Sequence, residues 1–229
     1  MFVIEWKQEF CSVWSYLSLR LNTIHNKMDF MQTALIVIDV QNDFCPGGAL
    51  GVADGDSIVP LINAKMNDYE IIVLTQDWHP AGHSSFASSQ ENKNPLETIE
   101  MPYGTQVLWP NHCIQGTQGA AFHPNLNTNL ANIIIRKGYN PRIDSYSAFF
   151  ENDRKTPTGL HGYLQSRGVT TVDLVGLATD FCVNFSALDA AKLGYKTRVF
   201  EKLTKAIDLA GSLDVARSTM IASGVTLEN

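Results

Sequence analysis

The chain contains few of the residues that mark extracellular, membrane or nucleic-acid-binding proteins. Its 229 residues include 4 cysteines, which stand far apart and form no Cys-x-x-Cys pair. A chain of this length does not need disulfides to fold, so the pattern predicts reduced thiols in a cytoplasmic protein. No apolar run approaches the ~18 residues of a membrane-spanning helix, and the formal net charge of -6 comes without a basic stripe. We therefore expect no membrane and no nucleic acid as partner.

Residues 1–30 differ in character from the rest of the chain. They mix aromatic residues with scattered charge, and Glu5, Lys7 and Glu9 argue against a secretory signal. Met28 and Met31 directly precede the first convincing strand, so either could be the true start. We predict an N-terminal extension of unknown role over 1–30 and one folded domain over 31–229.

From residue 34 onward, strand and helix patterns alternate. Short apolar runs rich in β-branched residues predict buried strands at 34–39, 70–76, 132–136, 170–176, 196–200 and 224–227. Apolar residues at helical spacing predict helices over 57–67, 181–193 and 213–222. Such alternation is typical of an α/β domain whose parallel sheet is covered on both faces. Residues 77–131 show no clear strand, and a polar loop of that length is usually functional.

Three residues with chemical potential each follow a predicted strand: Asp39, Lys137 and Cys182. The carboxyl ends of parallel strands meet at one edge, where ligands bind. Thr179 or Asp180 could cap the helix predicted over 181–193, which carries Cys182 in its first turn. The helix dipole and a nearby lysine would then lower the pKa of the thiol. Each residue alone also fits a structural role, but the coincidence of three strand ends favours a nucleophile, a cation and an acid/base.

A second set of residues has the spacing of metal ligands. Asp77 and His79 are two residues apart at a predicted strand end, so their side chains share a face. His112, in Trp-Pro-Asn-His-Cys, could fold back as a third ligand, and His83 lies nearby in sequence. One carboxylate and two imidazoles suit zinc, iron or manganese. The alternative is that these are ordinary loop histidines that form hydrogen bonds.

Both sets lie within motifs that resemble those of nicotinamidases, also called pyrazinamidases, of the isochorismatase-like cysteine hydrolases. The resemblance runs from about residue 33 to the C-terminus and excludes the extension. It rests on six ordered motifs: Ile-Asp-Val-Gln-Asn-Asp-Phe-Cys-Pro-Gly-Gly-Ala-Leu (38–50), Gln-Asp-Trp-His-Pro-Ala-Gly-His-Ser-Ser-Phe-Ala (76–87), Leu-Trp-Pro-Asn-His-Cys-Ile (108–114), Arg-Lys-Gly (136–138), Asp-Ser-Tyr-Ser-Ala-Phe-Phe (144–150) and Gly-Leu-Ala-Thr-Asp-Phe-Cys-Val (176–183).

The resemblance implies a three-layer α/β/α sandwich around a six-stranded, mainly parallel sheet. It implies a catalytic domain over 31–229 that deaminates nicotinamide to nicotinate, and pyrazinamide to pyrazinoate, and so feeds NAD salvage. The implied roles follow. Cys182 is the nucleophile, Asp39 the general acid/base and Lys137 the stabilising cation. The backbone N–H groups of Ala178 and Cys182 form the oxyanion hole, beside a cis Leu177–Ala178 peptide. Phe44 and Trp109 are the pocket walls, and Asp77, His79 and His112 hold one divalent metal ion, with His83 a weaker candidate.

Two alternatives stay open at the level of sequence. A related cysteine hydrolase for an N-carbamoyl or ureido substrate would share the Asp-Lys-Cys set, although such relatives do not generally carry the Asp-x-His and Trp-Pro-x-His pairs. A non-catalytic binding protein on the same scaffold is the second, and it is disfavoured because no member of the set is lost. The sequence leaves open the metal and the oligomeric state, including a homo-oligomer.

Overall fold

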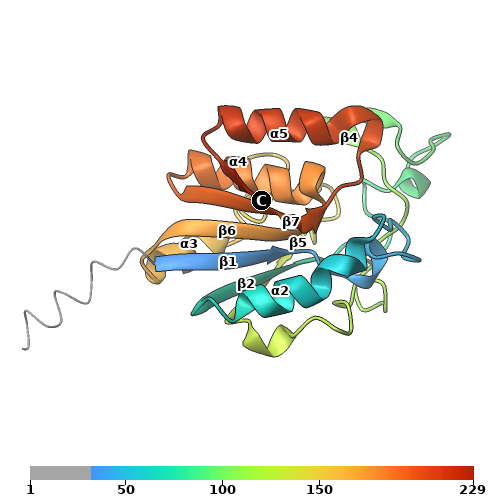
Figure 1. The fold of residues 1–229 in the computed structure, drawn as a ribbon. Helices are drawn as coiled ribbons and strands as arrows, with labels where there is room; N and C mark the ends of the chain where they lie inside the picture. Colours follow the sequence, from blue (N-terminus) through green and yellow to red (C-terminus); the bar gives the residue numbers. More distant parts are fainter. Residues whose placement is uncertain (1–31) are drawn as a thin grey trace, which may run out of the picture. The chain divides into compact units, whose positions relative to one another are not determined.

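A parallel sheet forms the centre of the protein (Figure 1), in a computed structural model that describes residues 32–229. Its six strands are ordered β5-β2-β1-β6-β7-β8, and every pairing is parallel. In chain order they are β1 (Gln32–Ile38), β2 (Ile71–Asp77), β5 (Ile133–Lys137), β6 (Val169–Leu177), β7 (Lys196–Lys205) and β8 (Thr226–Glu228). All six predicted strands are confirmed, and β7 continues beyond its predicted end.

Helices cover both faces of this sheet, which confirms the three-layer α/β/α sandwich. They are α2 (Val59–Met66), α3 (Leu160–Ser166), α4 (Asn184–Lys192) and α5 (Ser212–Ala222). α2 packs on one face, while α3, α4 and α5 pack on the other (Figure 1). The sequence analysis missed α3, a short helix that contains Gly162.

β1 is a continuous apolar run because helices cover both faces of the sheet. Ala34, Ile36 and Ile38 pack into the core beneath α3, α4 and α5, whereas Leu35 and Val37 pack against the α2 side. Successive side chains of a strand point to opposite faces, so a strand buried on both sides must be apolar at every position. Within residues 32–229, no helix has the length and apolar character needed to cross a membrane.

The long segment 77–131 contains a β-hairpin, so the prediction that it lacks strands is wrong. β3 (Thr98–Met101) pairs antiparallel with β4 (Gly104–Val107). The hairpin is short and largely solvent-accessible, which explains why no apolar run marks it. Gln106 is its exception, because that side chain is fully buried.

The predicted cap of the helix at Cys182 is also wrong. The chain enters α4 through a single π-helical turn (Thr179–Val183), and neither Thr179 nor Asp180 caps it. The Asp180 carboxylate instead accepts hydrogen bonds from Ile207 N at 3.0 Å and Asp208 N at 2.8 Å. It therefore ties the turn that carries Cys182 to the loop after β7. Such π turns are frequent at functional sites.

The strand order creates a switch point beside β1. The chain adds β2 and β5 on one side of β1 and then crosses to place β6 on the other. Crevices form outside the carboxyl ends of strands at such points, because the connections diverge to opposite faces. The predicted extension over 1–30, and a start at Met28 or Met31, lie outside the described residues.

Candidate active site

Asp39, Lys137 and Cys182 meet at the carboxyl edge of the sheet. Asp39 follows β1, Lys137 ends β5, and Cys182 lies in the π turn after β6. Lys137 Nζ is 2.8 Å from Asp39 Oδ2 and 3.5 Å from Cys182 Sγ. An Asp39 carboxylate oxygen and Cys182 Sγ lie within 4.8 Å of each other. The predicted convergence of these three strand ends is confirmed.

The two oxygens of the Asp39 carboxylate have different surroundings. Thr75 Oγ1 donates to Asp39 Oδ1 at 2.6 Å and accepts from Asp39 N at 3.1 Å. Oδ2 is buried and receives no well-aligned hydrogen bond, although Lys137 Nζ lies beside it. Asp39 also has a φ of 47°. A non-glycine residue in that region costs about 1–3 kcal/mol, a strain that clusters at functional sites.

Burial dominates the proton affinities of the three groups. It raises the pKa of the Cys182 thiol well above its usual range; Lys137 opposes the rise, and Asp39 and Asp77 add to it. The expectation of a lowered thiol pKa is therefore wrong, because desolvation outweighs the single cation. Burial likewise raises the pKa of Asp39 despite Lys137. Burial alone would lower the pKa of Lys137, but Asp39 and Asp77 raise it, so it stays an ammonium ion.

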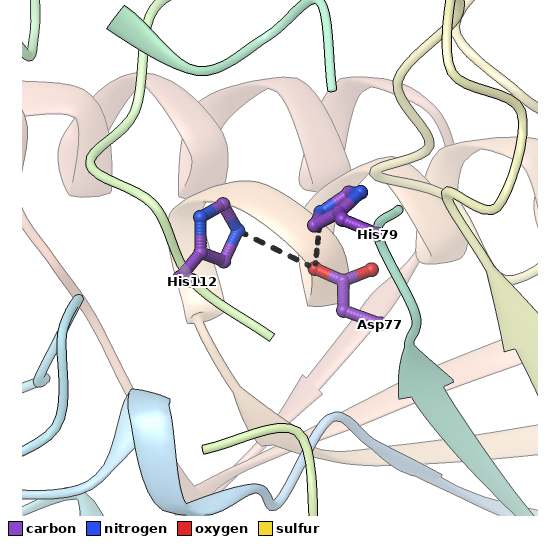
Figure 2. A group of neighbouring side chains, drawn as sticks. All are labelled: Asp77, His79 and His112. Atoms are coloured by element: carbon purple, nitrogen blue, oxygen red, sulfur yellow. Dashed lines mark ion pairs between the residues drawn. The ribbon is translucent and has the colours of Figure 1, made fainter. Parts of the chain in front are cut away.

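The predicted metal ligands also come together. Asp77 ends β2, His79 follows two residues later, and His112 arrives from the loop after β4. One oxygen of Asp77, Oδ2, lies 3.6 Å from His79 Nε2 and 3.9 Å from His112 Nε2 (Figure 2). The other, Oδ1, receives the Lys137 ammonium at 2.5 Å. Asp77 thus joins the two constellations that the sequence presented separately.

The two imidazoles are oriented to present free nitrogens. His79 Nδ1 donates to Gly138 O at 2.8 Å, and His112 Nδ1 donates to Pro110 O at 2.8 Å. Both rings therefore point Nε2 toward Asp77 and leave that nitrogen to an ion, the arrangement that backbone carbonyls impose on metal-binding histidines. Among residues 32–229, the buried His79 Nε2 has no hydrogen-bond partner, which is rare for a polar atom. This donor set fits a divalent cation.

His83 has a different environment. Its Nε2 donates to Asn140 O at 2.8 Å, and its Nδ1 accepts from Ser85 Oγ at 2.8 Å. Ser85 N also donates to Nδ1 at 3.2 Å. Both ring nitrogens are therefore engaged by the protein, and neither is presented to an ion in this conformation.

Gln41 is a supporting residue that the sequence analysis missed. Its side chain is fully buried and forms a pair of hydrogen bonds with the backbone of Asp77. Nε2 donates to Asp77 O at 2.9 Å, and Oε1 accepts from Asp77 N at 2.8 Å. This clamp fixes the end of β2, and with it the carboxylate that serves both constellations.

A small aromatic pocket of about 330 Å³, including its open mouth, lies above Cys182. Phe44 and Trp109, the predicted walls, line it together with residues to which no role was assigned from sequence: Leu50, Asp144, Tyr146, Phe181 and Ile207. Trp109 Nε1 donates to Tyr146 Oη at 3.1 Å. The motif at 144–150 was the available signal for Asp144 and Tyr146. The expected cis peptide between Leu177 and Ala178 is present.

Comparison with known proteins agrees with this geometry. The isochorismatase domain profile matches residues 33–227. The nicotinamidase of Acinetobacter baylyi is 54% identical over 209 residues, covering 91% of this chain and 95% of that protein. A nicotinamidase/pyrazinamidase structure from Acinetobacter baumanii superposes with a TM-score of 0.86 at 57% identity, covering 88% of this chain and 97% of the other.

A solved pyrazinamidase of Pyrococcus horikoshii in complex with zinc has a TM-score of 0.70 at 34% identity, and covers 86% of this chain and 98% of the other. The profile match spans nearly the whole described domain, and the relatives are matched over nearly their full length. The chain therefore belongs to the nicotinamidase/pyrazinamidase group of the isochorismatase-like hydrolase family.

Proposed function

We propose that the protein hydrolyses nicotinamide to nicotinate and ammonia, and pyrazinamide to pyrazinoate, through a thioester on Cys182. The observation that carries this proposal is that Cys182 lines an aromatic pocket and has behind it the Lys137 ammonium, 3.5 Å from Sγ, which in turn lies 2.8 Å from the Asp39 carboxylate. The named relatives support the choice of amide. Nicotinate formed in this way would feed NAD salvage.

Asp39 is the group that moves protons in this reaction. The raised pKa of Cys182 keeps the resting sulfur protonated, so attack on the carboxamide carbon requires a base. Asp39 Oδ2, which accepts no hydrogen bond, takes the thiol proton as the S–C bond forms. It then gives that proton to the departing nitrogen, and ammonia leaves. In the second half, Asp39 takes a proton from water, whose oxygen attacks the thioester carbonyl carbon. The C–S bond then breaks, Asp39 returns that proton to sulfur and restores the thiol, and the acid product loses its own proton to solvent and leaves as nicotinate.

Lys137 and the backbone stabilise the charges that develop. The ammonium at 3.5 Å from Sγ offsets the charge on sulfur once the proton has left. The N–H groups of Ala178 and Cys182, two residues that line the pocket, would hold the tetrahedral oxyanion. Removing one such donor typically costs about 3 kcal/mol of transition-state stabilisation. Phe44 and Trp109 would sandwich the aromatic ring of the substrate.

We also propose that Asp77, His79 and His112 hold one divalent ion of zinc, iron or manganese. When bound, the ion would attract the ring nitrogen of the substrate and so orient its carboxamide. The support is the buried, unpartnered Nε2 of His79, and the zinc complex of the Pyrococcus relative is consistent with it. Because misplacement by about 1 Å can cost on the order of a hundredfold in rate, benzamide, which lacks that nitrogen, should react slowly.

The rival activity on an N-carbamoyl or ureido substrate uses the same three residues but gives no role to the metal ligands. The deciding experiment measures ammonia release by the purified protein from nicotinamide, pyrazinamide, benzamide and an N-carbamoyl amino acid. Each substrate is tested with and without a chelator. We expect turnover of the first two and its loss with chelator. Turnover of the carbamoyl compound alone would establish the rival, and no turnover of any would favour a binding protein.

A further inference from the structure

The loop after β7 forms part of the pocket wall. It consists of residues 206–211, between the end of β7 and the start of α5, and its Ile207 lines the pocket. Ile207 is half-buried, and it packs against the same hydrophobic cluster as Leu50 and Phe44. The 206–211 loop is therefore a part of the pocket to which the proposed reaction gives no role.

The backbone of the 206–211 loop has a shape that other parts of the protein must hold in place. Asp208 has a φ of 54°, Ala210 a φ of 51° and Gly211 a φ of 87°. The side chain of a non-glycine residue crowds its own backbone in this left-handed region. Such conformations persist only where the surrounding structure fixes them.

The Asp180 carboxylate holds this loop. It is 4% exposed and accepts hydrogen bonds from Ile207 N at 3.0 Å, from Asp208 N at 2.8 Å and from the Ser212 hydroxyl. Among residues 32–229, no other side chain outside the loop accepts a hydrogen bond from residues 206–212. Ser212 begins α5, and the positive end of a helix dipole favours a carboxylate.

Asp180 also belongs to the π turn that carries the nucleophile. The turn is Thr179–Val183, so Cys182 lies two residues after Asp180. Cys182 and Ile207 both line the pocket. The hydrogen bonds of Asp180 therefore fix where the Ile207 wall stands relative to the thiol.

The lining of the pocket indicates which part of the substrate would meet this wall. In the proposed function, the carboxamide lies at Cys182, and the ring nitrogen lies toward Asp77 and His112. Both groups flank carbon 2 of nicotinamide, so carbon 5, which carries only hydrogen, points away from them. Leu50 and Ile207 are the branched aliphatic residues of the lining, and an apolar C–H edge suits such side chains.

We propose that Ile207 limits the size of the substrate at carbon 5 of the ring, and that Asp180 is the positioning residue that holds Ile207 in place. A methyl group at carbon 5 needs the space that the Ile207 side chain fills, so the wall favours nicotinamide over 5-methylnicotinamide. Without Asp180, the loop relaxes from its strained shape and this selectivity falls. The inference rests on the proposed function and adds a specificity-determining residue to it.

The test is the ratio of kcat/KM for nicotinamide to kcat/KM for 5-methylnicotinamide, measured as ammonia release by the purified full chain supplied with Zn²⁺. This ratio does not depend on the folded fraction of a preparation, because inactive protein lowers both values equally. For Ile207→Ala we expect the ratio to fall roughly 10-fold or more, the discrimination that one methyl-sized group typically provides in an apolar pocket.

The Asp180 variants should change the same ratio. Asp180→Asn should lower it several-fold, because the amide N–H₂ would face the N–H donors of the loop. In the double variant with Ile207→Ala, the ratio should fall no further than in Ile207→Ala alone, because both residues act through one wall. Ser212→Ala removes one of the three hydrogen bonds and should have a smaller effect. It keeps the proposal testable if Asp180→Asn does not fold.

Two matched controls remove similar groups elsewhere. Asp189→Asn changes another buried carboxylate, which is 4% exposed and pairs with Arg154. Leu203→Ala truncates an aliphatic side chain that packs on the same hydrophobic cluster as Ile207 but does not line the pocket. Both variants should keep the wild-type ratio, even where their melting temperature falls.

The outcomes separate the two proposals. If the wild-type protein releases no ammonia from nicotinamide, the proposed function is wrong and this inference fails with it. If it hydrolyses nicotinamide but shows no preference over 5-methylnicotinamide, or Ile207→Ala keeps the wild-type ratio, only the role of Ile207 is overturned. If Ile207→Ala lowers the ratio but neither Asp180→Asn nor Ser212→Ala does, or the losses add in the double variant, Asp180 does not act through this wall.

Discussion

Replacing Lys137 by methionine should lower the stability of the fold as well as abolish turnover. The side chain is fully buried, and its ammonium lies 2.8 Å from Asp39, 2.5 Å from Asp77 and 3.5 Å from Cys182. Removing one partner of a buried ion pair costs about 3–5 kcal/mol, because the remaining charges stay buried and unpaired. At about 2–4 °C per kcal/mol for a domain of this size, the melting temperature should fall by roughly 6–20 °C.

The pH dependence of this loss has a definite sign. Burial acts to raise the pKa of Asp77, but Lys137 and the two imidazoles bring it below its usual value in the folded protein. Its contribution to wild-type stability is therefore present above its unfolded pKa and is lost as the pH falls through the folded pKa. Without Lys137, the folded pKa of Asp39, which burial already raises in the wild type, rises further, and the folded pKa of Asp77 rises as well. The ionised carboxylates therefore cost more stability at neutral pH, and this cost is relieved in acid as they become protonated.

The assay is thermal melting of wild-type and Lys137→Met protein at several pH values between neutral and acidic, alongside ammonia release. We expect the melting temperature of the variant to lie furthest below that of the wild type near pH 7, and the difference to shrink toward acid. Turnover should be abolished at every pH. Adding Asp39→Asn to the variant should recover part of the stability and none of the activity. Lys65→Met, which breaks the exposed pair with Asp68, should stay within about 0.5 kcal/mol of wild type. A melting temperature lowered by less than about 2 °C, or by an amount that does not depend on pH, would refute the electrostatic account.

Three further predictions follow from the same geometry. Cys182→Ala should lower turnover by a factor on the order of 10⁴ or more while changing unfolding free energy by no more than about 1.5 kcal/mol; near wild-type ammonia release would exclude the thioester. Gly138→Ala should lose metal, measured by elemental analysis, because a Cβ there would collide with the His79 ring; Gly168→Ala has a similar positive φ but open space around it, and should keep its metal. A chain beginning at Met28 should retain full activity, because all the proposed site residues lie downstream; insoluble or inactive protein would show that the extension is needed.

Local sequence predicted the strands and their chemistry because both depend on near neighbours. A short β-branched run followed by a reactive residue predicts a buried strand and what stands at its end. Once the sheet is parallel, Asp39, Lys137 and Cys182 must meet at one edge. The Asp77-x-His79 pair is similarly local. The β3–β4 hairpin was missed because its short, polar strands bury too little surface to leave a periodic signal. α3 was missed because it spans only 7 residues, so its buried Leu160 and Leu164 make a single helical repeat, and it contains Gly162.

Only the tertiary structure decided the properties that depend on residues distant in the chain. The thiol pKa is raised because burial exceeds the effect of one lysine, and no motif carries that balance. The nitrogens of His83 are not presented to the proposed metal site, because they form hydrogen bonds with Ser85 and Asn140. Asp144 is seen to line the pocket only in the folded protein, where Gln106 of the β3–β4 hairpin donates to its carboxylate. The local sequence determines where a strand ends and which residue stands there. Desolvation and hydrogen-bond partners are determined only when distant segments pack together.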